Sequence, residues 1–533
     1  MTRRIFVLIA FLVSQQLFSQ NAAFSPHRTF SGGTVIIPDL TFSGDGIQTV
    51  SFPPERDAAK DIVIQPDGKI VVVGYDNNSP SSKIALTRLL QNGKLDSAFG
   101  TGGKVLIDLT IGGDRAYAVA LQTDGKIVVG ANAVPLGANG DNDFAVLRYL
   151  SNGTLDTSFG TNGFIIKDIN FRNNYLSDLA IQADGKILIV GITELPQGSI
   201  NLTAWRITTN GITDSTFNET GYFLPAQGIA ESRHGQTIEL QSDGKILLCG
   251  FMIQPTANVQ SLLSIRLKPN GTPDSTYGAT GEVIVDLGGT EEKIFGSDLD
   301  ANGNMVVACK VISGVGTADP YLVRLKPNGS RDSTFGDNGV ALCTIGTNFS
   351  SDYFTDVKVL SSGNILAVGV TNSRNQKESV FFSGFTISGD QIIEFGNVGL
   401  AVLPVGNKYV MPWAMALQED EKFVVAGEIS SDSVMGNDGQ FFTGRYAIVV
   451  IPNVLDLHTK SYKPYPQPLS QGEELRINLP IDTEFTILNN VGSKVFSGNI
   501  GLEGRVLKTG QLPSGIYLFT TNQAFKASRF LIE

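Results

Sequence analysis

Histidine and cysteine are both scarce in this chain, with three of each among 533 residues. Most zinc sites and much acid–base catalysis rely on histidine, so its scarcity leaves little room for either. His27 lies near the N-terminus, His458 lies in a polar stretch, and His234 precedes a strand in AESRHGQT, where we expect a surface loop. No nucleophile elbow, phosphate loop or His/Cys ligand cluster occurs. The sequence therefore predicts no catalytic residue, no cofactor-binding residue and no cofactor.

The cysteines are too few for a disulfide framework. Cys249, Cys309 and Cys343 each lie in an apolar, strand-like run, so we expect buried, unpaired thiols. Relative to the turn glycines Gly244 and Gly303, Cys249 and Cys309 differ by one position, which should place their side chains on opposite faces of their strands. None of the three follows the N-terminal apolar run, so a lipid anchor is not expected.

Positively charged residues are fewer than negatively charged ones. The formal net charge is -11 and the sequence pI is about 5.0. This balance argues against nucleic acid or an anionic membrane surface as a partner.

Long hydrophobic runs are absent. The longest near the N-terminus, Ile5–Val13, follows Arg3 and Arg4 and is shorter than the about 20 apolar residues that a transmembrane helix needs. Its position is typical of a secretory signal peptide, which we assign to residues 1–23. No transmembrane segment is expected after the signal peptide is removed.

Internal repetition dominates what the chain does contain. One element reads DIVIQPDGKIVVVG at 61, AVALQTDGKIVVG at 118, DLAIQADGKILIVG at 178 and TIELQSDGKILLCG at 237, with weaker copies at 297, 356 and 414. The glycines of its turn, with Glu421 in the seventh copy, recur every 57 to 60 residues. The sequence thus holds seven copies of a unit of about 59 residues.

Two further elements recur in the same order. One precedes each hairpin, as in LDSAFGTGG at 95 and LDTSFGTNG at 155. The other is an apolar run with a basic residue inside it; this residue is arginine in six copies, and we align Phe385 with it in the sixth. The six arginines are Arg88, Arg148, Arg206, Arg266, Arg324 and Arg445.

Each unit offers four short strands, for example KVLIDL, YAVALQ, KIVVGAN and FAVLRYL in the second copy. Asp-Gly suits the two-residue hairpin between the second and third of these. A single unit cannot bury both faces of its sheet, so the units must stack and close on themselves. We predict an all-β fold, a seven-bladed β-propeller over residues 34–451. We expect the strand near 46–52 to close the ring beside the strand near 445–451.

These three elements resemble the delta-60 repeat family of bacterial proteins. The resemblance covers about residues 34–451, because all three elements recur there in order. It implies a propeller-like β array and no defined activity.

A different unit follows the propeller. Residues 452–464 are polar and contain proline, which is typical of a linker. From 465 to 533 the runs ELRINL, EFTILNN, KVFSGNI, GIYLFTT and ASRFLIE predict a small antiparallel β-sandwich domain.

Five residues of this last domain form a recognisable pattern: Tyr465, Pro466, Pro468, Gly515 and Tyr517. They resemble the type A sorting domain of the type IX secretion system, with Gln467 and the terminal Glu533 as small departures. The resemblance implies a member of the Bacteroidota, export into the periplasm, and passage across the outer membrane by the type IX machinery as partner. It also implies an extracellular or outer cell-surface location, with the domain usually removed.

The residues that recur in every unit are expected to hold the blades together, because an active site occurs once. Aspartate in the first element should bind turn amides, the aromatic should pack between blades, and arginine should pair with a carboxylate or carbonyl. Examples of these structural repeat residues are Asp96, Phe99, Gly125, Arg148, Asp156, Phe159, Gly185 and Arg206.

Two loops rich in Asp, Asn and Gly are weak calcium candidates, through Asp141 and Asp143 in the first and Asp438 in the second. Neither has the regular acidic spacing of a known calcium loop, so solvated turns are favoured and no metal site is assigned.

The copies differ most between the third and fourth strands, as in YDNNSPSSK and ANAVPLGANGDND. Such loops share one rim, where propellers commonly bind ligands. A secreted or surface binding or adhesion module is the leading hypothesis, with a glycan or another surface polymer as partner. An extracellular enzyme acting on carbohydrates or lactones and an architectural surface protein remain alternatives. The enzyme would need carboxylates or histidine that break the repeat at the central channel, and the sequence shows no such cluster.

Overall fold

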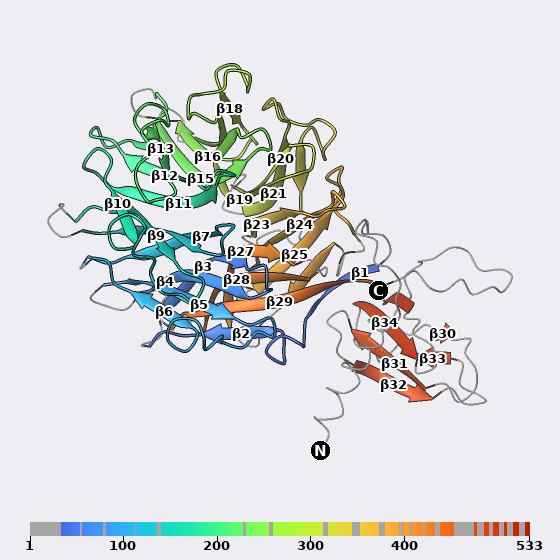
Figure 1. The fold of residues 1–533 in the computed structure, drawn as a ribbon. Coiled ribbons are helices and arrows are strands. Elements are labelled where there is room, and N and C mark those ends of the chain that lie inside the picture. The colour runs from blue at the N-terminus through green and yellow to red at the C-terminus, as the bar shows by residue number, and fades with distance from the viewer. Residues whose placement is uncertain are drawn as a thin grey trace.

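Seven antiparallel sheets follow one another along the chain and surround a central axis in the computed structural model (Figure 1). The structure describes residues 33–451, with gaps at 54–55, 78–80, 111, 136–139, 227–230, 255–258, 313–317, 344–351, 372–378, 394, 396–398, 404, 406–407, 419–421 and 432–437, and strands between 474 and 532. The expected signal peptide, the linker, His27, His458, Glu421 and the motif residues Tyr465, Pro466 and Pro468 lie outside the described residues. The prediction of a seven-bladed propeller is confirmed.

Blades 1 to 6 each have four strands, ordered from the channel outward as in the chain. Blades 1 to 3 consist of β3 (Asp57–Ile64), β4 (Ile70–Asp76), β5 (Lys83–Leu89) and β6 (Lys104–Ile107); β7 (Arg115–Leu121), β8 (Ile127–Ala133), β9 (Asp143–Tyr149) and β10 (Phe164–Lys167); and β11 (Asn174–Ile181), β12 (Ile187–Glu194), β13 (Ile200–Ile207) and β14 (Tyr222–Phe223). Blades 4 to 6 consist of β15 (Ser232–Leu240), β16 (Ile246–Gln254), β17 (Val259–Leu267) and β18 (Glu282–Val285); β19 (Glu291–Leu299), β20 (Met305–Ile312), β21 (Ala318–Leu325) and β22 (Val340–Leu342); and β23 (Tyr353–Val359), β24 (Ile365–Thr371), β25 (Ser379–Phe385) and β26 (Leu400–Leu403).

The blades are offset from the sequence unit by one strand. We expected KVLIDL to start the second blade, but its strand β6 pairs with β5 and forms the outer edge of blade 1. The cause is the turn between them: a bridge from Leu89 to Leu95 and a hydrogen bond from the Arg88 amide to the Gly103 carbonyl return the chain antiparallel to β5. The crossing to the next blade comes only after β6. The four strands of one blade therefore come from two consecutive copies of the repeat.

This offset is what closes the ring. Blade 7 holds β27 (Tyr409–Leu417), β28 (Lys422–Ser430) and β29 (Gln440–Ile451), and its outer edge comes from β1 (Gly33–Pro38) and β2 (Ile47–Val50) at the other end of the propeller. β2 pairs with Phe441–Gly444, whereas the strand beside Tyr446–Ile451 is β1. Closure by N-terminal strands is thus as expected, but the partner of the 445–451 stretch is residues 33–38 and not 46–52.

Apolar layers between neighbouring blades form the core. Each layer takes side chains from two blades; the layer between blades 3 and 4, for example, contains Leu188, Leu202, Leu248 and Leu263. Burying a side chain of this size contributes about 1.5–3 kcal/mol. The innermost strands also contact one another in succession, and β27 contacts β3 across the closure. Every blade therefore buries both faces, which explains the apolar runs without alternation.

Arginine–aspartate pairs connect the blades at one rim. Arg148 forms an ion pair with Asp156 at 2.8 Å, lies 4.6 Å from the centre of the Phe159 ring, and donates to the Thr209 carbonyl of blade 3. The same arrangement recurs between Arg88, Asp96 and Phe99, and between Arg206, Asp214 and Phe217. Each arginine thus joins its own turn to a carbonyl of the next blade, so these repeated residues hold the blades together.

Blade 6 lacks this pair, and our alignment of Phe385 with the arginines is wrong by one position. The amide of Asp96 donates to the Arg88 carbonyl, and the equivalent donor and acceptor in blade 6 are Ile392 and Gly384. A Cβ on Gly384 would lie 2.8 Å from the Phe395 ring, which occupies the space that arginine needs. An apolar contact therefore replaces the ion pair at this junction.

The hairpin glycines Gly125 and Gly185 have the positive φ that we expected, 81° in both, which glycine adopts without strain. The expected two-residue turn is wrong. The Gln122 amide donates to the Lys126 carbonyl and the Gly125 amide to the Gln122 carbonyl, so the loop holds three residues, of which only the glycine has a positive φ.

The cysteines are free and buried. Cys249 of blade 4 and Cys309 of blade 5 lie in the same apolar layer between these blades. Each thiol therefore faces the other blade, which is possible only because the two occupy opposite faces of their own strands, as expected.

The C-terminal strands form sheets of their own outside the ring (Figure 1). One is four-stranded and antiparallel, with the order β32 (Lys494–Asn499), β31 (Glu484–Asn489), β34 (Gly515–Thr521) and β35 (Ser528–Ile532); β30 (Glu474–Arg476) pairs with β33 (Val506–Lys508). Gly515 and Tyr517 of the expected sorting motif lie on β34.

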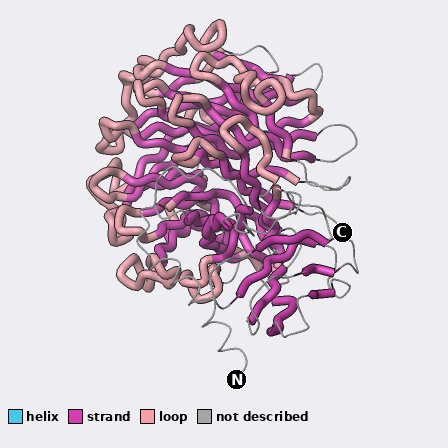
Figure 2. The backbone as a smooth tube through the Cα atoms, turned by 90° about the vertical axis from the view of Figure 1, so that its right-hand side faces the viewer, coloured by secondary structure: helices cyan, strands magenta, loops and turns pink. Residues whose placement is uncertain are grey.

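Strands and loops account for the described chain in Figure 2. No helix long and apolar enough to span a membrane occurs in that part of the chain.

Candidate ligand site at the mouth of the channel

All seven innermost strands are interrupted at the same place. The register between each of them and the next strand shifts by one residue, which leaves a single residue without a cross-strand partner. Bulges of this kind can re-aim a side chain and are frequent beside active sites. The bulged residues, from blade 1 to blade 7, are Lys60, Tyr117, Ser177, Gln236, Phe295, Thr355 and Trp413.

Glycine makes room for most of these bulges. In blade 4, a Cβ on Gly250 would lie only 1.8 Å from the His234 carbonyl oxygen, just before the bulge. The same position, on the second strand opposite the bulge, is glycine in five blades and is Ala131 and Cys309 in the other two. The glycine that ends the repeated DGKIVVVG segment is thus part of the bulge.

The bulges lie near one mouth of the channel. They fall in the first half of the innermost strands in blades 1, 2, 3 and 6 and at the middle of the strand in blades 4, 5 and 7. The first residues of these strands pair with the last residues of the second strands, as Ala58 pairs with Tyr75. The loops that vary most between copies connect the second strands to the third, so they leave from this same rim. Phe171, in the loop between β10 and β11, also lies here; it is 85% exposed and has a positive φ of 53°.

Aromatic and basic side chains meet at blades 7, 1 and 2. The Lys60 ammonium lies 3.8 Å from the centre of the Trp413 ring and 5.6 Å from that of Tyr75. The Arg115 guanidinium lies 5.0 Å from the centre of the same Tyr75 ring, which in turn is 6.1 Å from Tyr117. Burial, aided by Arg115, lowers the pKa of Lys60 to about 8, against the opposing effect of Glu428.

A second aromatic group lies on blades 5, 6 and 7. The rings of Phe295 and Tyr353 stack at 5.1 Å, and the Tyr353 hydroxyl donates to the Met411 sulfur at 3.5 Å. Lys310 lies 5.6 Å from the Tyr353 ring and pairs with Glu291 at 3.4 Å. The two groups adjoin at blade 7, so aromatic and cationic side chains follow the mouth around most of the ring.

His234 belongs to this mouth and not to a surface loop. It lies within β15, half-buried, with its ring stacked on Phe251 at 4.3 Å. Burial, aided by Lys293, lowers the pKa of His234 to about 4, so the imidazole is neutral at pH 7. Our expectation was wrong because the AESRHGQT segment lacks the apolar alternation by which strands are recognised.

Carboxylates line the channel below the bulges. Asp61, Asp178 and Asp356 each follow a bulged residue directly. Each accepts a hydrogen bond from a backbone amide of the next blade, at 2.7, 3.0 and 2.7 Å respectively. These aspartates come from blades 1, 3 and 6, yet they influence one another electrostatically, so their side chains face a common space. Burial, reinforced by Asp178, raises the pKa of Asp61 to about 8.

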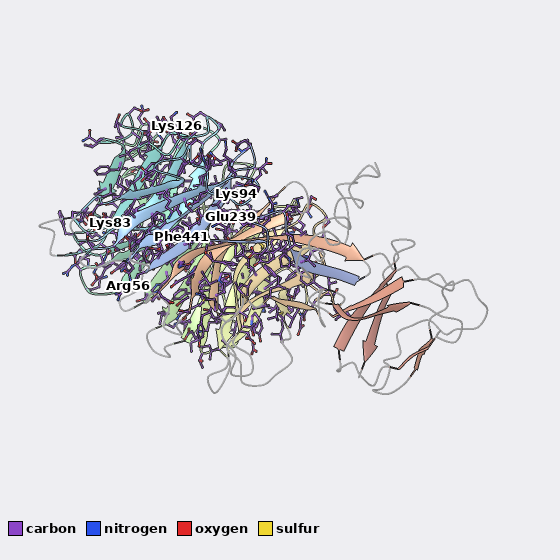
Figure 3. All side chains as sticks on the ribbon, turned by 90° about the horizontal axis from the view of Figure 1, so that it is seen from below. Arg56, Lys83, Lys94, Lys126, Glu239 and Phe441 are labelled. Carbon is purple, nitrogen blue, oxygen red and sulfur yellow. The ribbon has the colours of Figure 1, made fainter. Side chains whose placement is uncertain are left out.

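A further charged group lies two residues deeper on blades 4 to 6. Glu239 accepts a hydrogen bond from Ser297 at 2.9 Å, and Lys358 pairs with Asp356 at 3.2 Å. Burial, together with Asp298, raises the pKa of Glu239 to about 8. We expected no carboxylate cluster breaking the repeat at the channel, and this was wrong: Asp61, Asp178, Glu239, Asp298 and Asp356 come from five copies and influence one another across the channel. Figure 3 labels Glu239 among the side chains of the ring.

The calcium candidates do not form a ligand set in the described residues, where no three His, Cys, Asp or Glu side chains are placed to hold a metal ion. Asp143 is buried, and burial with the nearby Asp168 and Asp141 raises its pKa to about 6. Asp438 accepts hydrogen bonds from Ser430 and from the Ser431 amide.

Comparison with known proteins is consistent with the propeller. A family model described as a domain of unknown function (DUF5122) beta-propeller matches residues 65–99, 122–159, 182–217, 241–277 and 301–335. These segments run from the repeated hairpin to the aromatic of the next element in five blades. No curated protein matches the chain.

Solved structures that resemble the chain do so weakly. They include a catalytically inactive virginiamycin B lyase from Staphylococcus aureus (11% identity, TM-score 0.41, covering 75% of this chain and 98% of that one). Polysaccharide lyase Uly1 (11%, 0.46, 74% and 90%) and a PL25 ulvan lyase (13%, 0.44, 74% and 95%) are similar to the same extent.

Proposed function

We propose that this chain is a secreted or cell-surface β-propeller that binds a glycan or another surface polymer at the mouth of its channel. One observation carries the proposal. The residues that join the blades are nearly the same in every copy, whereas seven different side chains occupy the seven equivalent bulges. A regular repeat would make these seven positions identical. Because they differ around one opening, they are suited to recognise an asymmetric ligand.

The chemistry of the mouth supports a sugar polymer. Trp413, Phe295 and Phe171 offer apolar faces, while Ser177 and Gln236 offer hydrogen-bonding groups around the same opening. Ligand sites typically combine apolar and aromatic walls with a few placed polar groups. The loops that vary between copies leave from the same rim, and variable loops on a rigid scaffold commonly carry binding residues.

Binding of the processed protein to a glycan array tests this function. We expect binding that Trp413→Ala and Phe295→Ala each weaken at least about tenfold, since loss of a stacked aromatic costs about 1–3 kcal/mol. Ile212→Ala is the matched control, because Ile212 is 63% exposed in the turn after β13, on the opposite rim. Binding that both mouth variants leave intact, or no binding to any glycan or cell surface, would favour the architectural role.

The channel carboxylates favour a second candidate, an enzyme acting on extracellular carbohydrate or lactone. Groups that titrate near neutral pH are suited to proton transfer, and Asp61, Glu239 and Lys60 all have pKa values of about 8. New reducing ends or unsaturated products released from a bound polysaccharide, and lost in Lys60→Gln or Glu239→Gln, would establish the enzyme.

We propose that the chain is exported through a signal peptide at residues 1–23 and the type IX machinery, which residues 465–533 engage. The separate C-terminal sheets support an independent domain. Fusing residues 453–533 to a reporter with an unrelated signal peptide should carry the reporter out of a host that has this machinery. A reporter retained in the periplasm, in cells exporting their own cargo, would refute the assignment.

A further inference from the structure

Two cationic side chains stand close together at the mouth, on the innermost strands of blades 1 and 2. Lys60 is the bulged residue of β3, and Arg115 is the first residue of β7. Both lie over the ring of Tyr75, at 5.6 and 5.0 Å from its centre, and both are only partly buried.

Neither cation has a carboxylate partner among the described residues. Arg115 donates to the side chains of Asn77 at 2.7 Å and Ser82 at 3.2 Å, which are neutral. Lys60 contacts aromatic rings, and its nearest electrostatic influence from an acid comes from Glu428. Several cations of the opposite rim, in contrast, pair with aspartates, as Arg206 does with Asp214 and Lys69 with Asp67.

Holding two like charges together costs free energy, and the acid that opposes this cost at Lys60 is the buried Glu428, which forms no ion pair with it among the described residues. Burial lowers the pKa of Lys60, and the proximity of Arg115 acts in the same direction, whereas Glu428 opposes both. Asn77 directly follows β4 and Ser82 directly precedes β5, and both hold the Arg115 side chain in place, so the guanidinium is oriented without being neutralised. A site that keeps its cations oriented and unpaired is preorganised for an anion.

We propose that Lys60 and Arg115 bind an acidic group of the polymer, a uronate carboxylate or a sulfate ester, so that the ligand class is anionic polysaccharide. This inference rests on the proposed function. Arginine supplies planar, paired donors that match either oxyanion, and lysine supplies a point charge. The rings of Trp413, Tyr75 and Tyr117 then lie beside the sugar that carries the charge.

Pairs of polymers that differ in charge alone test the proposal and separate its two anion sources. Polygalacturonate is compared with its highly methyl-esterified form for carboxylate, and dextran sulfate with dextran for sulfate, by calorimetry on the processed protein. We expect at least tenfold tighter binding of the charged member in one pair. Lys60→Gln and Arg115→Gln should each remove most of that preference, and added salt should weaken binding of the charged member.

Two controls keep the test decisive. Lys94→Gln removes an exposed lysine of the turn after β5, on the opposite rim, and should leave binding unchanged. Weaker polymer binding by this variant would indicate a nonspecific charge effect and would overturn the proposal. Lys60→Arg should retain the preference, and melting temperatures should show that each variant is folded.

The outcomes also separate the inference from the function on which it rests. If neutral glycans bind as well as charged ones, and Trp413→Ala abolishes this binding while Lys60→Gln and Arg115→Gln do not, the anionic class is wrong and the mouth remains a glycan site. If no polymer binds, or if binding survives Trp413→Ala and both charge variants, both are overturned.

Discussion

Arg445 and Asp39 form an ion pair, with Nε and Oδ2 2.8 Å apart, although they lie near opposite ends of the propeller in sequence. Elsewhere in the ring the same pair joins residues eight positions apart, as with Arg88 and Asp96. Arg445 also donates to the Gln91 carbonyl of blade 1, just as the other arginines reach the next blade. The closure is therefore chemically equivalent to an ordinary junction between blades, and the offset of one strand makes this equivalence possible.

Removing one of these arginines should strongly destabilise the propeller. Arg206 and Asp214 are both about 5% exposed, so Arg206→Ala removes the nearest counter-charge of a buried carboxylate, leaving Lys186 at 3.5 Å, and deletes a bond to blade 4. We expect a loss of about 3–5 kcal/mol in the free energy of unfolding, measured in urea. Arg331→Ala, at an exposed arginine, should cost less than about 0.5 kcal/mol. A cost below about 1 kcal/mol for Arg206→Ala would show that the pair does not hold the blades.

Blade 6 supplies a natural comparison for this pair, because Gly384 and Ile392 replace it there. The double variant Arg206→Gly with Asp214→Ile should be more stable than Arg206→Ala, since it leaves no buried charge unpaired and lets Phe217 move as Phe395 does. Equal or lower stability of the double variant would mean that the blade 6 solution depends on residues beyond these two positions.

Deleting the closing strands should abolish cooperative unfolding. A chain lacking residues 33–52 loses β1 and β2, and with them Ile36, which packs against Phe423 and Tyr446 in the last apolar layer. The outer edge of β29 is then unpaired. Calorimetry should show a broad or split transition whose van't Hoff enthalpy falls below the calorimetric one. A single sharp transition at the original temperature would show that the ring does not depend on this closure.

The repeat made most of the fold predictable, because seven copies of a unit with four short strands admit few closed arrangements. Strand pairing was harder. KVLIDL follows its own turn motif in sequence, and only the hydrogen bonds around Leu95 and Gly103 assign it to the preceding blade. The site was largely missed in the sequence, because a bulge is a feature of the backbone hydrogen bonds and does not require a particular residue type. Lys60 and Trp413, for example, occupy equivalent bulges in the structure but have unrelated side chains. The repeated glycine opposite the bulge, at Gly74 and Gly250, was the one available sign.

That glycine gives a direct test of the bulge. Gly250→Ala would place a Cβ 1.8 Å from the His234 carbonyl oxygen, so the innermost strand must move. We expect a loss of about 1–3 kcal/mol in stability, and weaker ligand binding at the mouth. Cys309→Ala, at the equivalent position of blade 5 where a side chain already fits, should leave binding unchanged. Full stability and binding in Gly250→Ala would show that the bulge does not need this glycine.

The cysteines should be inert in the native protein. Burial raises the pKa of Cys249 and of Cys343 to about 12, so almost no thiolate is present at pH 8. We expect no reaction with a thiol-specific reagent within an hour in buffer, and three equivalents after unfolding in guanidinium. Fast reaction of a native thiol, or fewer than three equivalents under nonreducing unfolding, would contradict the buried, unpaired state.

The channel carboxylates should make the propeller more stable in mild acid than at alkaline pH. The pKa of Asp61 and of Glu239 is about 8 in the folded state, above ordinary values near 4, so the folded protein holds more protons than the unfolded chain between these limits. Stability should therefore fall as pH rises from about 5 to 8. Asp214 acts in the opposite direction: burial alone would raise its pKa, but hydrogen bonds from Thr216 and the charge of Arg206 lower it, so its contribution is lost only in stronger acid.

Asp61→Asn isolates the loss of stability that ionisation of a channel carboxylate causes as pH rises. The amide oxygen can still accept the hydrogen bond from the Val119 amide, but the side chain can no longer ionise. The variant should lose part of the fall in melting temperature between pH 5 and 8, and at pH 8 it should exceed the parent protein by about 1–2 kcal/mol. Asp337→Asn, at an exposed turn, should reproduce the parent profile. Ionised Asp61 must repel Asp178 across the channel. A parent protein that gains stability from pH 5 to 8 would therefore mean that these side chains do not share the channel. The same would follow if Asp61→Asn left the change of melting temperature with pH unaltered.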